Sequence, residues 1–502
     1  MIYDLLIVGG GINGCAIARD AAGRGLSVLL VEQGDLACAT SSASTKLIHG
    51  GLRYLETHEF RLVQEALAER ELLLGAAPHI IWPLKFVLPH EQGLRPAWMI
   101  RLGLLLYDHL ATRKRLEGSH AVSLLGNAFG APLRPSYKKG FTYADCWVDD
   151  ARLVVANALC AREHGAEIRV GSRFVSALRM RDRWIATLDG EGGGEDVEAR
   201  VIVNAAGPYV SRVLDGSLHI KSRKHARLVK GSHIVTRRLY EGDHAYILQN
   251  TDKRIIFAIP YEQDFTLIGT TDVVHEAAPS PVEISTEETE YLTASINRCF
   301  NRVITSSDIV WSFSGLRPLF DDGAIDASVV TRDYAFDLDA EGGATALSVF
   351  GGKITTARKL AEHALEQLTR FFPHMGPTWT QNAALPGGEI VGADFSSFLA
   401  QLTRQKPFLK PAVARRLARA YGTRVWRLLG EARGMADLGE DFGHGLTTVE
   451  LRYLVQEEWA RSAEDVLWRR SKIGLHLSEA QRGAVAAALP AIREALTPAA
   501  HP

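Results

Sequence analysis

The sequence lacks the features that mark several classes of protein. No stretch approaches the ~18 apolar residues that a membrane-spanning helix needs, so any membrane contact is expected to be peripheral. The five cysteines show neither a C-x-x-C pair nor metal-ligand spacing, which predicts a reduced chain without a metal site. The 57 Lys and Arg residues nearly cancel the 58 Asp and Glu residues, and this balance argues against a nucleic-acid partner. The chain opens directly on an apolar strand without a targeting peptide, so we expect a cytoplasmic protein.

A glycine-rich turn near the start of the chain organises the first predicted domain. The apolar run Leu5–Val8 predicts a buried strand, and Gly9, Gly11 and Gly14 then supply the G-x-G-x-x-G spacing that opens a helix. The first glycine permits the turn, the second lets a pyrophosphate approach the backbone, and the third lets the helix pack closely. A second apolar strand ends at Glu32, whose carboxylate can accept hydrogen bonds from a ribose. Together these features predict a dinucleotide-binding unit.

Two further regions are expected to contact the dinucleotide. A loop of small hydroxyl residues comes after the second strand and can wrap the diphosphate with side-chain and backbone hydrogen bonds. Residues 201–207 read as a strand ending in small residues, which would let the backbone reach a cofactor. The expected contacts in these regions are Thr40, Ser41, Ser42, Lys46, Leu47, Ala206 and Gly207.

The pattern of predicted elements divides the chain into three parts. Alternating strands and helices predict an α/β, Rossmann-like cofactor domain. Successive β-rich segments between residues 223 and 272 predict a separate substrate-binding domain with an antiparallel sheet. Clear helix-start and helix-stop signals near the end predict an all-helical C-terminal cap. The cofactor domain comprises residues 1–75, 145–210 and 310–375, the substrate-binding domain 76–144 and 211–309, and the cap 385–502.

The most conspicuous apolar segment is Pro96–His109, with Arg113–Arg115 just downstream. It carries Trp98, Arg101 and Tyr107 among aliphatic residues. This composition suits a helix that lies in a membrane interface. A buried core helix explains the same composition, and the sequence leaves both alternatives open.

Several unusual strings occur along nearly the whole length of the chain. They are Gly9–Gly25, Thr40–Tyr54, Cys146–Leu153, Lys230–His233, Gly269–Asp272, Ser314–Pro318 and Gly351–Lys359. In these strings, and in their order, the chain resembles the aerobic, FAD-dependent glycerol-3-phosphate dehydrogenases. Two positions depart from that pattern: Ala16 stands where glycine is common, and Ala357 stands where tyrosine is expected. The second departure puts a tyrosine contact near the flavin in doubt.

The resemblance implies a fold, a reaction and a cellular location. The fold is that of the glycine and D-amino-acid oxidases, with FAD as cofactor. The reaction is the oxidation of sn-glycerol 3-phosphate to dihydroxyacetone phosphate, with electrons passed on to ubiquinone or menaquinone. The implied enzyme is a homodimer, peripherally bound to the inner face of the cell membrane. Related glycerophosphate oxidases carry an insertion for which this chain is too short, so a quinone acceptor is expected instead of oxygen.

A second glycine turn, residues 351–356, opens a predicted helix that runs to residue 372. Beside a flavin, such a turn would aim N–H groups at the pyrimidine edge, where negative charge accumulates when the ring accepts a hydride. One glycine turn would then hold the pyrophosphate and the other the redox ring. The expected cofactor contacts here are Gly352, Lys353, Ile354 and Thr355.

The proposed reaction needs cations for a phosphate dianion and a base for the hydroxyl proton. Arginine suits the phosphate because its planar fork matches the oxygens, and histidine suits the proton because its pKa lies near neutrality. We prefer His49 as the base, with His233 as the runner-up, and Arg317 would also stabilise the developing alkoxide. The expected substrate-binding residues are Arg53, Tyr54, Thr270, Arg332 and Lys353, together with Arg317.

Two other functions are alternatives. An amino-acid-oxidase-type flavoenzyme needs one carboxylate-binding arginine and an apolar pocket, whereas this chain offers several cations. A flavin-dependent RNA-binding or assembly protein without turnover needs a basic domain, which the net charge of −1 opposes.

Overall fold

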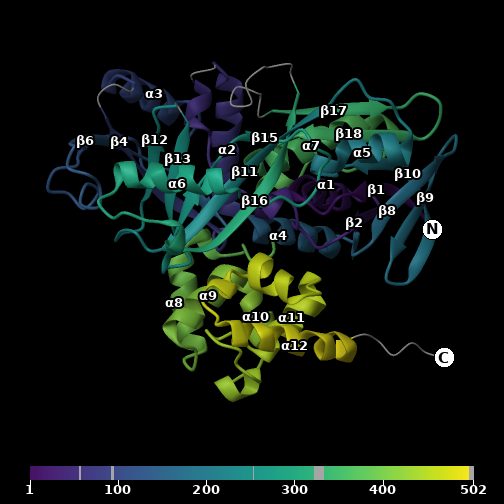
Figure 1. Ribbon diagram of the computed structural model, residues 1–502. Coiled ribbons are helices and arrows are strands. Elements are labelled where there is room, and N and C mark those ends of the chain that lie inside the picture. The colour runs from purple at the N-terminus through teal and green to yellow at the C-terminus, as the bar shows by residue number, and fades with distance from the viewer. Residues whose placement is uncertain (56–57, 92–94, 253, 322–332, 497–502) are drawn as a thin grey trace.

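Two large sheets form the upper body of the molecule, and a domain of helices lies beneath them (Figure 1). The computed structural model describes residues 1–55, 58–91, 95–252, 254–321 and 333–496. Of Arg53 it describes the backbone only. Within these ranges, no helix combines the length and the apolar character needed to cross a bilayer.

The first sheet has eight strands and a parallel centre. In sheet order its strands are β17 (Tyr334–Asp339), β18 (Thr345–Gly351), β10 (Gly193–Asn204), β1 (Ile2–Val8), β2 (Val28–Glu32) and β7 (Glu167–Val170), and the hairpin of β8 (Arg173–Arg179) and β9 (Trp184–Gly190) joins β10 through β9. The central strands are apolar runs because both faces of the sheet are covered. This is the Rossmann-like α/β architecture that the sequence predicts.

Helices and a hairpin cover the two faces of this sheet. On one face, α1 (Ile12–Gly23) packs with α4 (Asp150–Glu163) and α7 (Ala357–Leu368) in one apolar core. On the other face, β8, β9 and residues 210–220 enclose a second core. Because β1, β10 and β18 run parallel, their carboxyl ends meet at the same edge of the sheet. Ligands of open α/β sheets bind at such an edge.

The second sheet has ten strands, and its pairs are antiparallel except for one. In sheet order its strands are β15 (Val273–Val274), β11 (Ala226–Arg237), β14 (Phe265–Gly269), β13 (Ile255–Tyr261), β12 (Ala245–Gln249), β4 (Ile81–His90), β6 (Lys139–Val148) and β3 (Leu47–Ile48), with β16 (Ile309–Phe320) paired to β11 and β5 (His120–Ser123) paired to β6. The exception is the parallel pair β12–β4, which joins strands from two distant parts of the chain. β16 belongs to this sheet, although the sequence analysis placed residues 310–375 in the cofactor domain.

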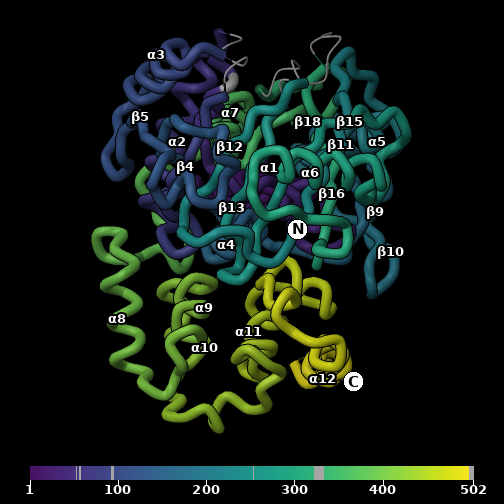
Figure 2. Tube along the Cα trace, turned by 60° about the vertical axis from the view of Figure 1, so that its left-hand side comes forward, coloured from purple at the N-terminus to yellow at the C-terminus, as the bar shows by residue number. Residues whose placement is uncertain are grey.

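Besides α1, α4 and α7, the upper body carries α2 (Phe60–Ala76), α3 (Ala97–His109) and α6 (Thr286–Cys299). The helical cap contains α8 (Phe395–Gln405), α9 (Pro411–Tyr421), α10 (Val425–Leu429), α11 (Thr448–Glu458) and α12 (Glu479–Leu496), which share a core of their own. The cap lies below α4 in both views (Figures 1 and 2). Helix α9 begins with Pro411 at its first turn and ends at Gly422, as the sequence signals predict.

Helix α3 is buried on one face and exposed on the other. Its inner face is buried through Ile100, Leu104 and Tyr107. Its outer face is apolar and exposed, with Trp98 at 69% and Leu102 at 58% accessibility. The helix lies at the outer edge of the upper body, on the side away from α5 (Val210–Arg212) (Figure 2). It is therefore neither a fully buried helix nor a helix free of the core.

Candidate functional site

The N-terminal glycine turn is packed too closely for side chains. An added Cβ on Gly14 would lie 2.0 Å from the Gly9 carbonyl oxygen, and one on Gly9 would lie 2.6 Å from the carbonyl oxygen of Ala205. Gly9 also has φ +114°, which favours glycine. Gly11 is the N-cap of α1 and makes no side-chain capping bond. Bare backbone therefore lines the start of the helix, as a pyrophosphate site requires.

The hydroxyl loop lies against this turn. Ser41 Oγ accepts a hydrogen bond of 3.0 Å from the Ile12 amide, in the first turn of α1. Thr40 Oγ1 donates to the Leu316 carbonyl at 2.5 Å and so ties the loop to β16. Ser42 Oγ donates to the carbonyl of Ala39 within the same loop, at 3.4 Å. The structure thus places Ser41 against the glycine turn and Thr40 against β16, and their contact with a cofactor stays a prediction.

Glu32 holds backbone amides on both sides of the turn. Its carboxylate accepts hydrogen bonds from the Gly10 amide at 2.7 Å and from the Gly34 amide at 2.9 Å. Burial raises the pKa of Glu32, while the two backbone bonds oppose that rise. The carboxylate lies at the end of β2, beside the N-terminal glycine turn. Its contact with a ribose stays a prediction.

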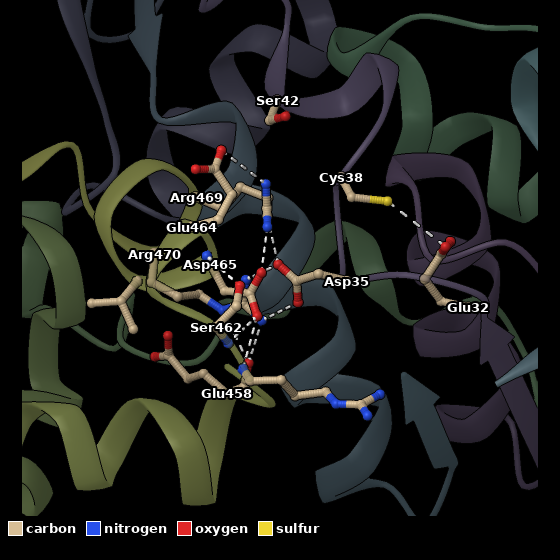
Figure 3. A network of polar contacts seen from close by, with 12 residues as sticks. Glu32, Asp35, Cys38, Ser42, Glu458, Ser462, Glu464, Asp465, Arg469 and Arg470 are labelled. Atoms are coloured by element: carbon tan, nitrogen blue, oxygen red, sulfur yellow. Dashed lines mark hydrogen bonds and ion pairs between the residues drawn. The ribbon is translucent and has the colours of Figure 1, made fainter. Parts of the chain in front are cut away.

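The loop after Glu32 is clamped by the cap. Asp35 accepts two hydrogen bonds of 2.6 Å from the guanidinium of Arg470, which is fully buried, and one of 2.7 Å from Arg469 (Figure 3). Arg470 also donates to the Glu458 carbonyl. Through these bonds the C-terminal domain fixes a loop that belongs to the nucleotide-binding unit. The sequence alone gives no sign of this role for the cap.

The second glycine turn meets the first across the sheet edge. Asn13 Nδ2, in the first turn of α1, donates to the Gly351 carbonyl at 3.1 Å. A Cβ on Gly352 would lie 2.9 Å from the same amide nitrogen. Asn13 Oδ1 is buried and accepts no hydrogen bond from any residue that the structure describes. Asn13 was missed by the sequence analysis, although a polar residue in the otherwise apolar first turn of α1 is the signal that would have found it.

Of the remaining predicted cofactor residues, four lie near the ends of β10 and β18 and one lies in the second sheet. Ala206 and Gly207 follow β10 after Ala205, and the Ala206 amide donates to Asn204 Oδ1 at 3.3 Å. Ile354 and Thr355 form the short helical turn that precedes α7. Leu47 is buried in β3.

Lys46 is engaged by a carboxylate. Its ammonium is 1% exposed and donates to both oxygens of Asp150, at 2.8 and 2.9 Å, and to the Ser42 carbonyl at 3.0 Å. Burial lowers the pKa of Lys46, and the charge of Asp150 opposes that shift. Lys46 therefore fixes the hydroxyl loop to α4, which suits indirect support of a cofactor better than a direct ion pair with it.

His233 lies in the middle of β11 and is fully buried. Its Nε2 atom is 3.0 Å from Thr45 Oγ1, and its ring stacks on Phe313 with centroids 4.8 Å apart. Nδ1 has no hydrogen-bond partner within the described part of the chain. Burial lowers the pKa of His233 well below its ordinary value, and the positive charges of Arg317 and Lys46 add to this shift. The imidazole is therefore neutral at neutral pH.

Arg317 and Thr270 form a second group beside His233. Arg317 lies on β16, pairs with Asp272, and donates to Thr270 Oγ1 at 2.6 Å. A Cβ on Gly231 would lie 2.0 Å from Arg317 Nη2, so the guanidinium lies across bare backbone of β11. These bonds hold the Arg317 guanidinium in one orientation.

A buried glutamate supports this group from α6. Glu288 accepts hydrogen bonds from Ser232 Oγ at 2.9 Å and from Thr271 Oγ1 at 2.6 Å, and it pairs with Lys230 at 2.7 Å. It thereby ties β11 to the segment that carries Thr270. The capping box of α6, formed by Ser285 and Glu288, places this carboxylate.

A third group comes from the segment after β3. The His49 amide donates to Thr355 Oγ1 at 3.4 Å, which joins this segment to the second glycine turn. The ammonium of Lys353 lies 4.1 Å from the centre of the Tyr54 ring, a cation–π distance. Tyr54 belongs to the helical turn Leu52–Leu55, which also includes Arg53. Arg332 lies outside the described residues.

Comparisons with known proteins agree with this geometry. A family model described as FAD dependent oxidoreductase matches residues 4–358, and one described as the C-terminal domain of alpha-glycerophosphate oxidase matches residues 378–499. The glycerol-3-phosphate dehydrogenase of Pseudomonas aeruginosa is 55% identical over 96% of this chain and 94% of its own length. The D-erythritol 1-phosphate dehydrogenase of Brucella abortus is 51% identical over 96% of each chain. The crystal structure of the glycerol-3-phosphate dehydrogenase from Bacillus halodurans with FAD superposes with a TM-score of 0.74 at 26% identity, covering 98% of this chain and 95% of that one.

Proposed function

Since the chain belongs to the FAD-dependent oxidoreductases, and within them to the glycerol-3-phosphate dehydrogenases, we propose a specific reaction for it. The proposed reaction is the oxidation of sn-glycerol 3-phosphate to dihydroxyacetone phosphate. The observation that carries the proposal is identity above one half, over nearly the whole length, to an enzyme named for that substrate. The cations and the hydroxyl-bearing side chains of the site supply the chemistry that such a substrate needs.

The residues present fit FAD. The N-terminal glycine turn has no room for a Cβ at Gly9 or Gly14, and the lack of side chains at Gly9 and Gly11 lets a diphosphate approach the backbone at the start of α1. The buried Oδ1 of Asn13 needs a donor, which the N–H-bearing edge of a flavin ring would provide. Gly9, Gly11, Gly14 and Ser41 would hold the pyrophosphate, and the turn 352–355 would lie beside the ring. When bound, FAD supplies the two-electron acceptor for a hydride.

We assign the phosphate of the substrate to the cationic group. Asp272 and Thr270 hold the guanidinium of Arg317 in one orientation. Lys353 and Tyr54 form a second pair, from another part of the chain. Arg53 and Arg332 complete the proposed set. Several fixed cations favour a dianion over the single carboxylate of an amino acid.

The proton of the substrate hydroxyl goes to a histidine in this proposal. His49 is preferred because it is only partly buried and its backbone is joined to the second glycine turn through Thr355. His233 is the runner-up, since its burial keeps the imidazole neutral but makes it a weaker base. Its bond with Thr45 fixes the orientation of the ring. Arg317 would stabilise the alkoxide that develops as the proton leaves.

A second substrate has a specific observation in its favour. The relative named for D-erythritol 1-phosphate is almost as similar to this chain as the one named for glycerol 3-phosphate. Both substrates present a phosphate and a hydroxyl, so the same cations would serve either. The two are separated by experiment.

Purified protein tests the proposal directly. Anaerobic addition of sn-glycerol 3-phosphate should bleach the flavin absorbance, and glycerol, which lacks the phosphate, should not. Parallel reactions with D-erythritol 1-phosphate and with D-amino acids distinguish the other substrates. Bleaching by an amino acid but by neither phosphate would refute the assignment.

Contact with a membrane and a quinone completes the proposal. The exposed apolar face of α3, which includes Trp98, Leu102 and Leu105, suits an interfacial helix on the inner face of the cell membrane. The basic residues downstream suit anionic lipids, although Arg113 also pairs with Asp108 and Arg115 donates to the Gly392 carbonyl. Ubiquinone or menaquinone as acceptor, a cytoplasmic location and a homodimer rest on the resemblance alone.

A further inference from the structure

The backbone amide of Gly50 is held by a side chain from a different part of the fold. Gly50 is the residue after His49, in the segment that leads to Tyr54. Its N–H donates to the hydroxyl of Tyr107, on α3, with an N–O distance of 2.8 Å, and both groups are buried. A Cβ on Gly50 would lie 2.8 Å from the same hydroxyl. The contact is therefore as close as glycine allows.

The hydroxyl of Tyr107 is itself fixed by a buried ion pair. It donates to the carboxylate of Asp145, on β6, at 2.9 Å from each oxygen. Asp145 pairs with Arg70 of α2 at 2.5 Å, and all three side chains are at most 3% exposed. Burial and the neighbouring carboxylate raise the pKa of Tyr107 well above its ordinary value, so the hydroxyl keeps its proton. The proton points to Asp145, and a lone pair is left to accept the Gly50 N–H.

The same segment is held on its other side by the second glycine turn. The His49 amide donates to Thr355 Oγ1 at 3.4 Å, and the Tyr54 ring lies against the ammonium of Lys353. The segment 49–54 is thus anchored between the cofactor side and α3. On the α3 side the Tyr107 hydroxyl accepts the Gly50 N–H, and the packing of Leu52, Tyr54 and Leu55 against the same core accompanies this bond.

We propose that Tyr107 is a positioning residue for the reaction, which sets the place of His49 and Tyr54 through its hydrogen bond with the Gly50 amide. This inference rests on the proposed function for its kinetic consequence, but not for its structural one. Without the hydroxyl, the buried Gly50 N–H loses the Tyr107 acceptor and keeps only its interaction with the Asp145 carboxylate behind it, so the segment is expected to shift. Even a small displacement of groups that contact the substrate lowers the catalytic rate strongly.

The test compares Tyr107→Phe with Tyr143→Phe in the flavin-loaded protein. Tyr143 is a matched control because it is equally buried and its ring lies 6.0 Å from that of Tyr107, yet within the described residues it makes no hydrogen bond to Gly50 or Asp145. Amide exchange of Gly50, relative to that of Leu104 in α3, should become about tenfold faster in Tyr107→Phe. kcat/KM for sn-glycerol 3-phosphate should fall about ten- to a hundredfold in Tyr107→Phe and by less than about threefold in Tyr143→Phe.

The outcomes separate the inference from the proposed function. Unchanged Gly50 exchange in Tyr107→Phe overturns the positioning role, and so does an equal loss of kcat/KM in both variants. If neither sn-glycerol 3-phosphate nor D-erythritol 1-phosphate reduces the wild-type flavin, the proposed function fails. The exchange comparison then still decides whether Tyr107 holds the segment.

Discussion

The ion pair between the cap and the nucleotide loop gives the sharpest test of how this molecule is assembled. Arg470→Gln removes a side chain that is 0% exposed and donates twice to Asp35, at 2.6 Å each time, and also to a backbone carbonyl. Breaking a buried pair by removing one partner costs about 3–5 kcal/mol. Arg469 still reaches Asp35 at 2.7 Å, so the expected loss of unfolding free energy is about 2–4 kcal/mol.

Loss of the Arg470–Asp35 ion pair should also weaken FAD binding, because Asp35 lies three positions after Glu32 and their loop borders the N-terminal glycine turn. Denaturant unfolding of the loaded protein measures the first effect, and titration of apoprotein with FAD measures the second. Arg173→Gln is the matched control, since Arg173 makes a surface pair with Asp189 at 2.7 Å and both side chains are about half exposed. A surface pair contributes about 0–1 kcal/mol. Equal effects of the two substitutions on both measurements would refute the reasoning.

Single positions give three further predictions. Gly14→Ala should abolish FAD retention because its Cβ would lie 2.0 Å from the Gly9 carbonyl oxygen. Gly103→Ala is the control and should bind FAD normally, because nothing lies within 4 Å of its added Cβ. Flavin absorbance after gel filtration measures FAD retention in both variants. Trp98→Ser should weaken sedimentation with anionic vesicles while leaving reduction by soluble substrate intact, and unchanged sedimentation would contradict an interfacial α3. Burial lowers the pKa of His79 to about 3, so on acidification the unfolded chain binds a proton at this histidine before the folded protein does. The free energy of unfolding should therefore fall as the pH drops below about 6.5. Between pH 6.5 and 5, His79→Gln should lose about 2 kcal/mol less unfolding free energy than the wild type, as measured by denaturant unfolding at each pH.

The local parts of the cofactor site could be predicted from the sequence. The strand, glycine turn and helix from Leu5 to Gly25 are specified by an apolar run and by glycine spacing, which act within one short segment. The second glycine turn and the cap helices are local in the same sense. The α/β fold class is confirmed, and so is membership of the FAD-dependent family. The domain boundaries and the roles of single site residues stay predictions.

The partners across the site were beyond such reasoning. Asn13 bonds to Gly351 from 338 positions away, and Lys46 pairs with Asp150 from 104 positions away. No local pattern around Lys46 shows that its ammonium pairs with α4, and its contact with a cofactor stays a prediction. Nor does any local pattern show that β16 pairs with β11 in the second sheet.

The sequence by itself determined which segments become strands, turns and helices around the dinucleotide, because glycine spacing and apolar periodicity act between near neighbours. Only the tertiary structure decided that Arg470 clamps the nucleotide loop, that Thr45 meets His233, and that Tyr107 turns its hydroxyl to Gly50. Each of these contacts joins elements that are distant in the chain. Their geometry is fixed by how the two sheets and the cap pack, and no local pattern carries that information.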